Sequence, residues 1–578
     1  MLREALPRGG GQAADGQPAQ GLTRRALRGP AALAGVAGRH RLFSVALGLA
    51  IVPRIVAILG YQPAILFRLD TYDYLWGAVH VRPNPVNTSG YSLVLWVLRP
   101  FHSLALIAGL QQLAGLVIAI LVYAVLRRWG VRSWIATLAA LPVLFGPAQL
   151  MLEQLIMADL LALLLMMAAF AVLLLRDPPS AQRSAVAGLL MGASVLVRPT
   201  ALPLIPAMAI YLLARRAPWR RVLAVLAAGA VPLVIYAAWF ASAYGSLNLT
   251  NSNGLFLWTR TMSFANCAVI KPPANLQALC PNRQPGYLNQ PVASRPLPKR
   301  YLWDHQAWQW QPPSTGLVPD TAAFTKAKND RAMSFAIHAI AAQPLAYLHV
   351  VAKDALHPFV GDSTLDFPAG QTSASGLSKA NLAYALAAVR GYTGSAAGIG
   401  PYLGHHYGYR LRQPFGRLMN DYQRVVLFPG PLFGLILIAG LAGILIPRRR
   451  SAAAALLWFS AVVSIVLPIA EHEYTYRYVV PAIPLACMAL ALAFRDRAPA
   501  DRALAASGPA AGTGGTGYGP IATDADATAT DGATPTDGAT PTAGATATAD
   551  AERPAAAAGG DAEGPDLTPE SSGSADQP

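Results

Sequence analysis

The stretch SLALIAGLQQLAGLVIAILVYAVL (103–126), RRWGVR (127–132) and SWIATLAALPVLFGPAQL (133–150) predicts the fold of this chain. Two apolar runs, each long enough to cross about 30 Å of hydrocarbon, flank a short basic connection. The pattern recurs along the 578 residues, of which 54% are hydrophobic and only 13% are charged. Such a chain is typical of a polytopic membrane protein.

The formal charge of +16 would suggest a nucleic-acid partner in a soluble protein. Here the arginines gather in short clusters between apolar blocks, where they act as topology signals. No nucleic-acid site is predicted.

The apolar runs predict about ten crossings at about 20 residues each. Residues 184–214 are too long for one span and short for two, and Arg198-Pro199 divides them, so we predict a short hairpin with arms of roughly 14 residues. The other runs lie at 43–60, 103–126, 133–150, 155–175, 222–243, 425–446, 453–470 and 478–494.

This topology places the arginine clusters on the same side as the basic N-terminal tail, which is then the cytoplasm. A single crossing at 184–214 would instead put the triple arginine at 448–450 outside. We therefore expect a multi-pass protein of the plasma membrane with both termini cytoplasmic.

Five regions follow from this topology. They are a disordered basic cytoplasmic tail (1–41), an N-terminal transmembrane core (42–243), an external segment (244–424), C-terminal transmembrane helices (425–495) and a disordered cytoplasmic tail (496–578). The predicted fold class is an all-α polytopic bundle with a large external segment.

The external segment contains Cys267 and Cys280. Export favours a disulfide between them, with two free thiols as the alternative. Residues 331–359 have helical apolar spacing interrupted by Lys353, Asp354 and histidines, which predicts a helix lying on the membrane surface.

Acidic and basic residues recur at the external membrane boundaries, in four motifs: DTYD (70–73), GPAQLMLEQLIMADLL (146–161), GLLMGASVLVRPTALPLIP (188–206) and EHEYTYRYVVPAIPLA (471–486). Together they resemble the polyprenyl-phosphate-dependent glycosyltransferases of the GT-C fold. That superfamily includes protein O-mannosyltransferases, lipid A aminoarabinose transferases and actinobacterial arabinosyl- and mannosyltransferases. The resemblance covers roughly residues 42–495.

The resemblance implies a catalytic base early in the first external loop, where Asp70 stands, followed by Tyr74 and the Gly-Tyr of NTSGYSLVLWVL (87–98). Many members carry adjacent acids there, whereas this chain has Asp70 and Asp73, so Asp73 is a second catalytic candidate. The Arg198-Pro199 pair and Arg477-Tyr478, before Pro481 and Pro484, also look like family hallmarks.

The chemistry of sugar transfer also calls for a base and for a phosphate-binding arginine. A sugar on a polyprenyl phosphate is already activated, so transfer needs one base for the acceptor hydroxyl and a cation for the departing phosphate. Arg198 and Arg477 are the phosphate-binding candidates, because a guanidinium offers paired hydrogen bonds to phosphate. A single displacement predicts inversion at the anomeric carbon. As alternatives, Asp70 is a solvated acid in a loop, and Arg198 and Arg477 anchor helix ends to the lipid headgroups.

Other residues are expected to line the substrate cavity: Tyr72, Tyr74, Glu153, Asp159, Arg260 and Tyr478. Asp159 lies about one turn inside an apolar helix, where an unpaired charge costs about 3 kcal/mol, so we expect an arginine partner. Glu153 is expected to reach the external cavity. Arg260, in LTNSNGLFLWTRTMSFANC (249–267), is a candidate sugar or acceptor contact, with an ordinary polar loop as the alternative.

No cofactor is required by this chemistry. A divalent metal could be held by Glu471, His472 and Glu473 with the histidines of GHHYGYR (404–410), although their spacing is unspecific. The expected partners are a polyprenyl-phosphate sugar donor, with mannose or arabinose tried first, a glycan, lipid or protein acceptor, and membrane lipids. A transporter or flippase of lipid-linked glycans, and an assembly scaffold, remain alternatives, and the sugar, acceptor, carrier length and oligomeric state stay open.

Overall fold

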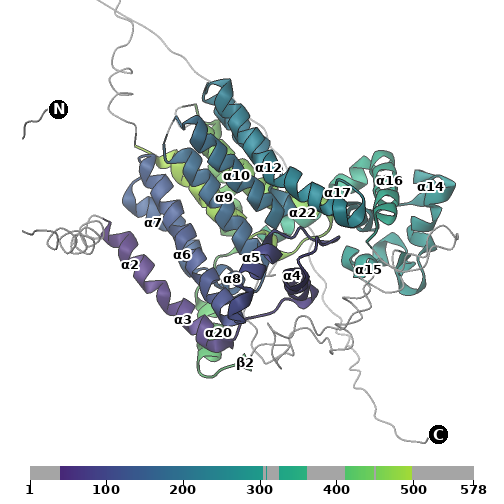
Figure 1. Ribbon diagram of the computed structural model, residues 1–578, viewed down its shortest axis with the longest axis horizontal. Coiled ribbons are helices and arrows are strands. Elements are labelled where there is room, and N and C mark those ends of the chain that lie inside the picture. Colours follow the sequence, from purple (N-terminus) through teal and green to yellow (C-terminus); the bar gives the residue numbers. More distant parts are fainter. Residues whose placement is uncertain are drawn as a thin grey trace, which may run out of the picture. The chain divides into compact units, whose positions relative to one another are not determined.

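Apolar helices packed side by side make up most of the computed structural model (Figure 1). It describes residues 40–176, 178–303, 307–308, 324–360, 410–447 and 451–496. Each predicted run contains an apolar helix: α2 (Arg41–Leu49) with α3 (Ile51–Gly60), α6 (Leu104–Arg128), α7 (Ser133–Phe145), α9 (Ala158–Leu174), α10 (Ala181–Val197), α11 (Leu204–Ala214), α12 (Trp219–Tyr244), α21 (Gly430–Leu445), α22 (Ala452–Glu471) and α23 (Ala482–Ala491).

Five stretches are long and apolar enough to cross a membrane: Arg41–Gly60, Leu104–Arg128, Trp219–Tyr244, Ala452–Glu471 and Tyr476–Phe494. Three bent pairs of helices also pass this test when each pair is counted together. The chain is a multi-pass membrane protein of the all-α class, as predicted.

Residues 184–214 form two helices, in agreement with the predicted hairpin. Arg198 is extended (φ −144°, ψ 110°) because the residue before a proline avoids the helical region, and α10 therefore ends at Val197. Gly188 lies against Val225 and Gly192 against Gly229, so α10 and α12 run in the same direction. α11, which connects them, packs against α12, while α10 and α12 contact each other directly.

Two regions differ in detail from the sequence expectation. Residues 147–154, at the junction of the predicted runs 133–150 and 155–175, form a buried helix, α8 (Pro147–Gln154), bent by 49° from α7 at Gly146-Pro147. Residues 331–359, expected to form one helix, belong to two, α16 (Lys326–Ala342) and α17 (Pro344–Val360), bent by 100°. A proline starts the second helix in each case, because it cannot donate the hydrogen bond that would continue the first.

The loop predicted to be the first external one contains regular secondary structure. It contains β1 (Tyr61–Gln62), α4 (Arg68–His80) and α5 (Gly90–Leu98), and β1 pairs antiparallel with β2 (Arg410–Leu411). Ile65 donates to the carbonyl of Gln154 (3.0 Å) and accepts from Ile156 (3.0 Å), which fastens this loop to the α8–α9 connection.

The segment predicted to be external (244–424), called the external segment below, has its own apolar core, separate from that of the membrane helices. Trp258 of α13 (Asn253–Thr261) and Phe335 of α16 are fully buried in it. α16 therefore packs against this core, and its place on the membrane surface stays a prediction. The remaining elements here are α14 (Cys267–Ile270), η3 (Ala274–Leu279), η4 (Pro281–Arg283), η5 (Gly286–Leu288), η6 (Val292–Ser294) and α15 (Pro298–Trp303).

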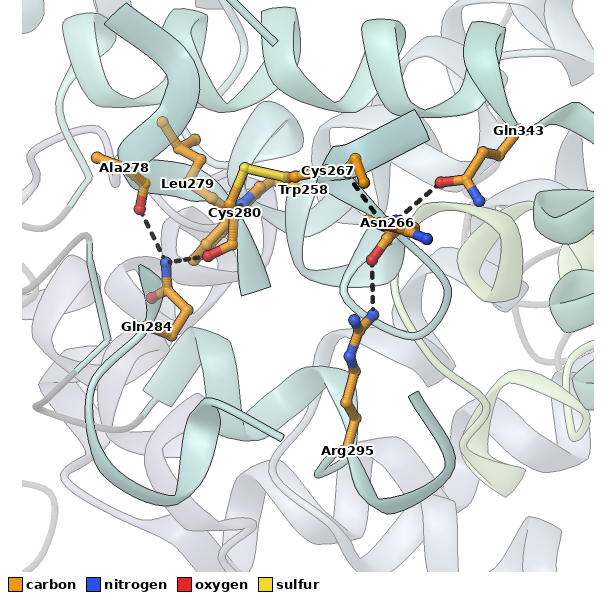
Figure 2. The surroundings of a disulfide bond; sticks show 11 residues. Trp258, Asn266, Cys267, Ala278, Leu279, Cys280, Gln284, Arg295 and Gln343 are labelled. Atoms are coloured by element: carbon orange, nitrogen blue, oxygen red, sulfur yellow. Dashed lines mark hydrogen bonds between the residues drawn. A yellow bond between two sulfur atoms is a disulfide. The ribbon is translucent and has the colours of Figure 1, made fainter. Parts of the chain in front are cut away.

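The predicted disulfide is present in this core. Cys267 at the start of α14 is bonded to Cys280, which follows η3 (Figure 2). Trp258 donates its indole N–H to the carbonyl of Leu279 (3.0 Å), and Gln284 donates to Ala278 (3.0 Å). The disulfide and these bonds attach the short helical turns to α13.

Candidate active site

Four charged residues that are far apart in the sequence meet at one end of the bundle. Arg477 donates to the Asp70 carboxylate (2.7 Å), and Arg198 donates to Asp159. The ring of Tyr478 joins the two pairs, because the guanidinium carbons of Arg198 and Arg477 lie 5.2 and 5.3 Å from its centroid. These four residues and Tyr478 are called the charged cluster below.

Each member of the charged cluster stands where a helix begins or ends. Asp70 is in the first turn of α4 and Asp159 in the first turn of α9, where the helix dipole favours negative charge. Arg198 follows α10, and Arg477 lies in η9 (Tyr476–Tyr478) between α22 and α23. The predicted arginine partner of Asp159 is therefore confirmed, and it is Arg198.

The cluster is sheltered but open to a ligand. The side chains of Asp70 and Arg477 are 26% and 14% exposed, whereas Asp159 is only 2% exposed. Nε of Arg477 is buried and has no hydrogen-bond partner among the described residues. Arg477 thus keeps an unused donor while it holds Asp70.

Of the two tyrosines of α4 predicted to line the cavity, Tyr74 lies near the charges of the cluster. Tyr72 and Tyr74 are buried, and Tyr74 packs edge-on against Tyr91 (5.1 Å between centroids). Burial, with smaller effects from the nearby charges of the cluster, raises the pKa of Tyr74 well above its usual range. Tyr74 therefore stays protonated and can serve as a hydrogen-bond donor.

Asp73, the second catalytic candidate, is bonded to residues outside the charged cluster. Its carboxylate is buried and accepts from the side-chain amides of Asn84 (2.5 Å) and Asn87 (3.2 Å). Asp73 thereby holds the loop between α4 and α5 in place. Gly90 then starts α5, where an added Cβ would lie 2.5 Å from the carbonyl oxygen of Leu196, so this glycine lets the loop approach the end of α10.

Glu153 does not reach an external cavity, which corrects its predicted position. It is fully buried and paired with Arg54 of α3 (2.9 Å), and it also accepts from Gln149 (2.9 Å). Arg54 was missed by the sequence analysis. The signal was available, because a lone arginine inside IVPRIVAILG (51–60) requires a partner within the membrane.

Arg260 also lies elsewhere than predicted. Its side chain is 1% exposed and bonded to Asp354 of α17 (2.6 Å), so it joins α13 to α17 and does not line an open cavity. The structure thus gives Arg260 a neighbour that the local polar sequence did not indicate.

His472 and Glu473, two of the candidate metal ligands, are bonded to other protein groups. His472 contacts Thr259 (3.0 Å), and Glu473 accepts from the backbone of Lys299 (3.2 Å). Among the described residues, no three His, Cys, Asp or Glu side chains group so as to hold a metal ion. The histidines predicted to complete the site, His405 and His406, lie outside the described residues.

An apolar cavity of about 310 Å³ lies close in sequence to the charged cluster, because Tyr476, the residue before Arg477, lines it. Tyr476 and Val480 line it on one side, and the breaks between α7 and α8 and between α20 (Phe415–Val425) and α21 line the others. Its prolines, valines and leucines would accept a hydrocarbon chain.

Comparison with known proteins finds a family model that matches part of the chain. Residues 99–196 match the family model of dolichyl-phosphate-mannose-protein mannosyltransferase. This match confirms the resemblance to the GT-C glycosyltransferases over that stretch, which contains Glu153 and Asp159 but stops short of Arg198 and excludes Asp70 and Arg477. No curated protein matches the chain.

Two solved structures were found with low similarity. The Archaeoglobus fulgidus oligosaccharyltransferase in the apo form is 14% identical, with a TM-score of 0.33, over 77% of this chain and 50% of that one. ArnT from Cupriavidus metallidurans bound to undecaprenyl phosphate is 15% identical, with a TM-score of 0.29, over 79% and 76%. The chain thus matches only half the length of the first.

Proposed function

We propose that this chain is an integral membrane glycosyltransferase that moves one sugar from a polyprenyl phosphate to an acceptor hydroxyl on the external face. Asp70 is the general base, and Arg198 and Arg477 bind the donor phosphate. The observation that carries the proposal is the charged cluster, in which a half-buried carboxylate and two arginines from three different external connections meet.

The apolar cavity supports a lipid donor. Tyr476, the residue before Arg477, lines this cavity, and we propose that the isoprenoid chain of a phosphate bound to Arg477 lies against its apolar residues. The family-model match supports the same class of donor, since its name specifies a dolichyl-phosphate sugar.

Transfer would occur in one displacement. Asp70 takes the proton of the acceptor hydroxyl, the oxygen attacks the anomeric carbon, and the bond to the phosphate oxygen breaks on the opposite face. Arg477 and Arg198 stabilise the negative charge that develops on the leaving phosphate. The product is inverted at the anomeric carbon.

The test uses proteoliposomes with radiolabelled polyprenyl-phosphate mannose or arabinose and a crude envelope acceptor. Asp70→Asn should lower transfer by a hundredfold or more while donor binding remains, the effect expected on losing a general base. Asp330→Asn is the matched control, because Asp330 is about half exposed and contacts only Lys326 in the described bonds.

Equal transfer by wild type and Asp70→Asn would remove Asp70 from the mechanism. No transfer by either, with labelled lipid appearing across the bilayer, would identify a flippase instead. The anomeric configuration of the product, read by NMR, tests inversion independently.

A further inference from the structure

The connection that carries Arg477 is held by the external segment. Residues 470–475 comprise the end of α22 and its connection to η9, and residues of the external segment contact most of them. Tyr347 donates its hydroxyl to the carbonyl of Ala470 (3.1 Å), the Lys299 backbone donates to Glu473 (3.2 Å), and the rings of His357 and Tyr474 lie 4.9 Å apart.

The most buried of these contacts joins His472 to α13. His472 is 9% exposed, and its Nδ1 lies 3.0 Å from the hydroxyl of Thr259. That hydroxyl donates to the carbonyl of Phe256 (2.8 Å), so its oxygen is left to accept from Nδ1–H of the imidazole. The Phe256 ring meets the same imidazole edge-on at 4.9 Å.

His472 stays neutral in this place. Burial, followed by the positive charges of Arg260, Arg477 and Lys299, lowers the pKa of His472 to about 3. The single N–H on Nδ1 is therefore retained across ordinary pH, and the contact with Thr259 does not switch on titration.

α13, which carries Thr259, is itself held by several buried contacts. Trp258, the neighbour of Thr259, is fully buried and bonded to Leu279 beside the disulfide. Asn329 of α16 accepts from the backbone of Gly254 at the start of the helix (2.7 Å). The position of α13 is thus fixed by the core of the external segment.

We infer that Thr259 and His472 are positioning residues for Arg477, through which the external segment holds the phosphate-binding arginine at the charged cluster. This inference rests on the proposed function. His472 lies five residues before Arg477, so release of His472 frees the connection that places the guanidinium against Asp70. A displacement of about 1 Å at a reacting group can cost up to a hundredfold in rate.

α13 supplies a matched pair of variants. Thr259 and Thr261 are both fully buried, but the described bonds of the Thr261 hydroxyl go only to the Trp258 carbonyl within the same helix (2.7 Å). Thr259→Val removes the contact with His472, whereas Thr261→Val removes a hydroxyl of the same kind without touching that connection. Thr259→Ser and His472→Asn restore an acceptor and a donor at the contact.

The probe is undecaprenyl phosphate, titrated against purified protein in nanodiscs, with Kd and donor KM measured for each variant. Thr259→Val and His472→Leu should raise both by about tenfold, while Thr261→Val, Thr259→Ser and His472→Asn stay within about twofold of wild type. A Tm that falls equally in Thr259→Val and Thr261→Val, together with equal Kd values, would show a merely structural role.

Failure of this inference and failure of the proposed function would give different results. If wild type binds the probe and all variants bind alike, the inference is overturned and the proposed function stands. If wild type itself does not bind undecaprenyl phosphate, the donor class is wrong and both are overturned. Loss of binding in Thr259→Val that Thr259→Ser does not restore would also contradict the inference.

Discussion

Arg54 satisfies the backbone at the break between α7 and α8. Its guanidinium donates to the carbonyls of Val143 (3.0 Å) and Leu144 (2.8 Å) as well as to Glu153. The carbonyl of Val143 would normally accept from residue 147, which is a proline without an N–H. A buried arginine is thus retained because it replaces hydrogen bonds that the proline removes.

Removal of Arg54 should be strongly destabilising. Arg54→Met leaves the Glu153 carboxylate buried without its cation and the two carbonyls without donors, at a cost of about 3–5 kcal/mol. The measurement is thermal unfolding in detergent. The double variant Arg54→Met/Glu153→Gln should recover part of the loss, because it buries no unpaired charge, and a strictly additive pair would contradict this account.

At the scale of elements, close packing of α10 against α12 sets the place of Arg198. The glycines of GLLMG (188–192) face α12, and a Cβ on Gly192 would lie 2.3 Å from the carbonyl oxygen of Gly229. Small residues four apart are a familiar signal for close helix contacts in membranes. They were visible in the sequence, but the partner helix was not.

Gly192→Ala should push α10 away from α12 and cost about 1–3 kcal/mol of stability through overpacking. Gly109→Ala is the matched control, since an added Cβ in α6 would meet nothing within 4 Å. Thermal unfolding of the two variants should therefore differ clearly. A similar Tm for both would show that α10 and α12 are less closely packed than described.

In the molecule as a whole, the connections between helices gather at two ends of the bundle. Asp496 donates its backbone N–H to Gly130 (3.0 Å) in the basic connection after α6, so the end of the last span meets the loop predicted to be cytoplasmic. Asp70, Asp159, Arg198 and Arg477 meet at other connections. This separation agrees with two crossings at 184–214, the number that places the arginine clusters on one side of the membrane.

Orientation can be tested with single cysteines in a Cys487→Ser background and a membrane-impermeant maleimide. Leu247→Cys, at a position 77% exposed after α12, should be labelled in intact cells. Ala181→Cys and Trp219→Cys, at the first residues of α10 and α12, should react only after permeabilisation. Labelling of Ala181→Cys and Trp219→Cys from opposite sides would exclude the hairpin.

The membrane class, the positions of the apolar runs and the break at Arg198-Pro199 could be predicted from the sequence, which also favoured the disulfide over two free thiols. These features depend on local properties, namely the length of apolar runs, the geometry before a proline and the scarcity of cysteine. Asp70, Arg198 and Arg477 were predicted from the resemblance to the GT-C glycosyltransferases and the chemistry of sugar transfer, and Asp159 from its charge inside an apolar helix.

Only the tertiary structure decided which charges pair. It joined Asp70 to Arg477 across 407 positions and buried Glu153 against Arg54. It also put α16 into a separate core and brought Thr259 to His472. Such contacts depend on how helices far apart in the sequence pack together, and the spacing of residues along one helix carries no information about the side chains it will meet.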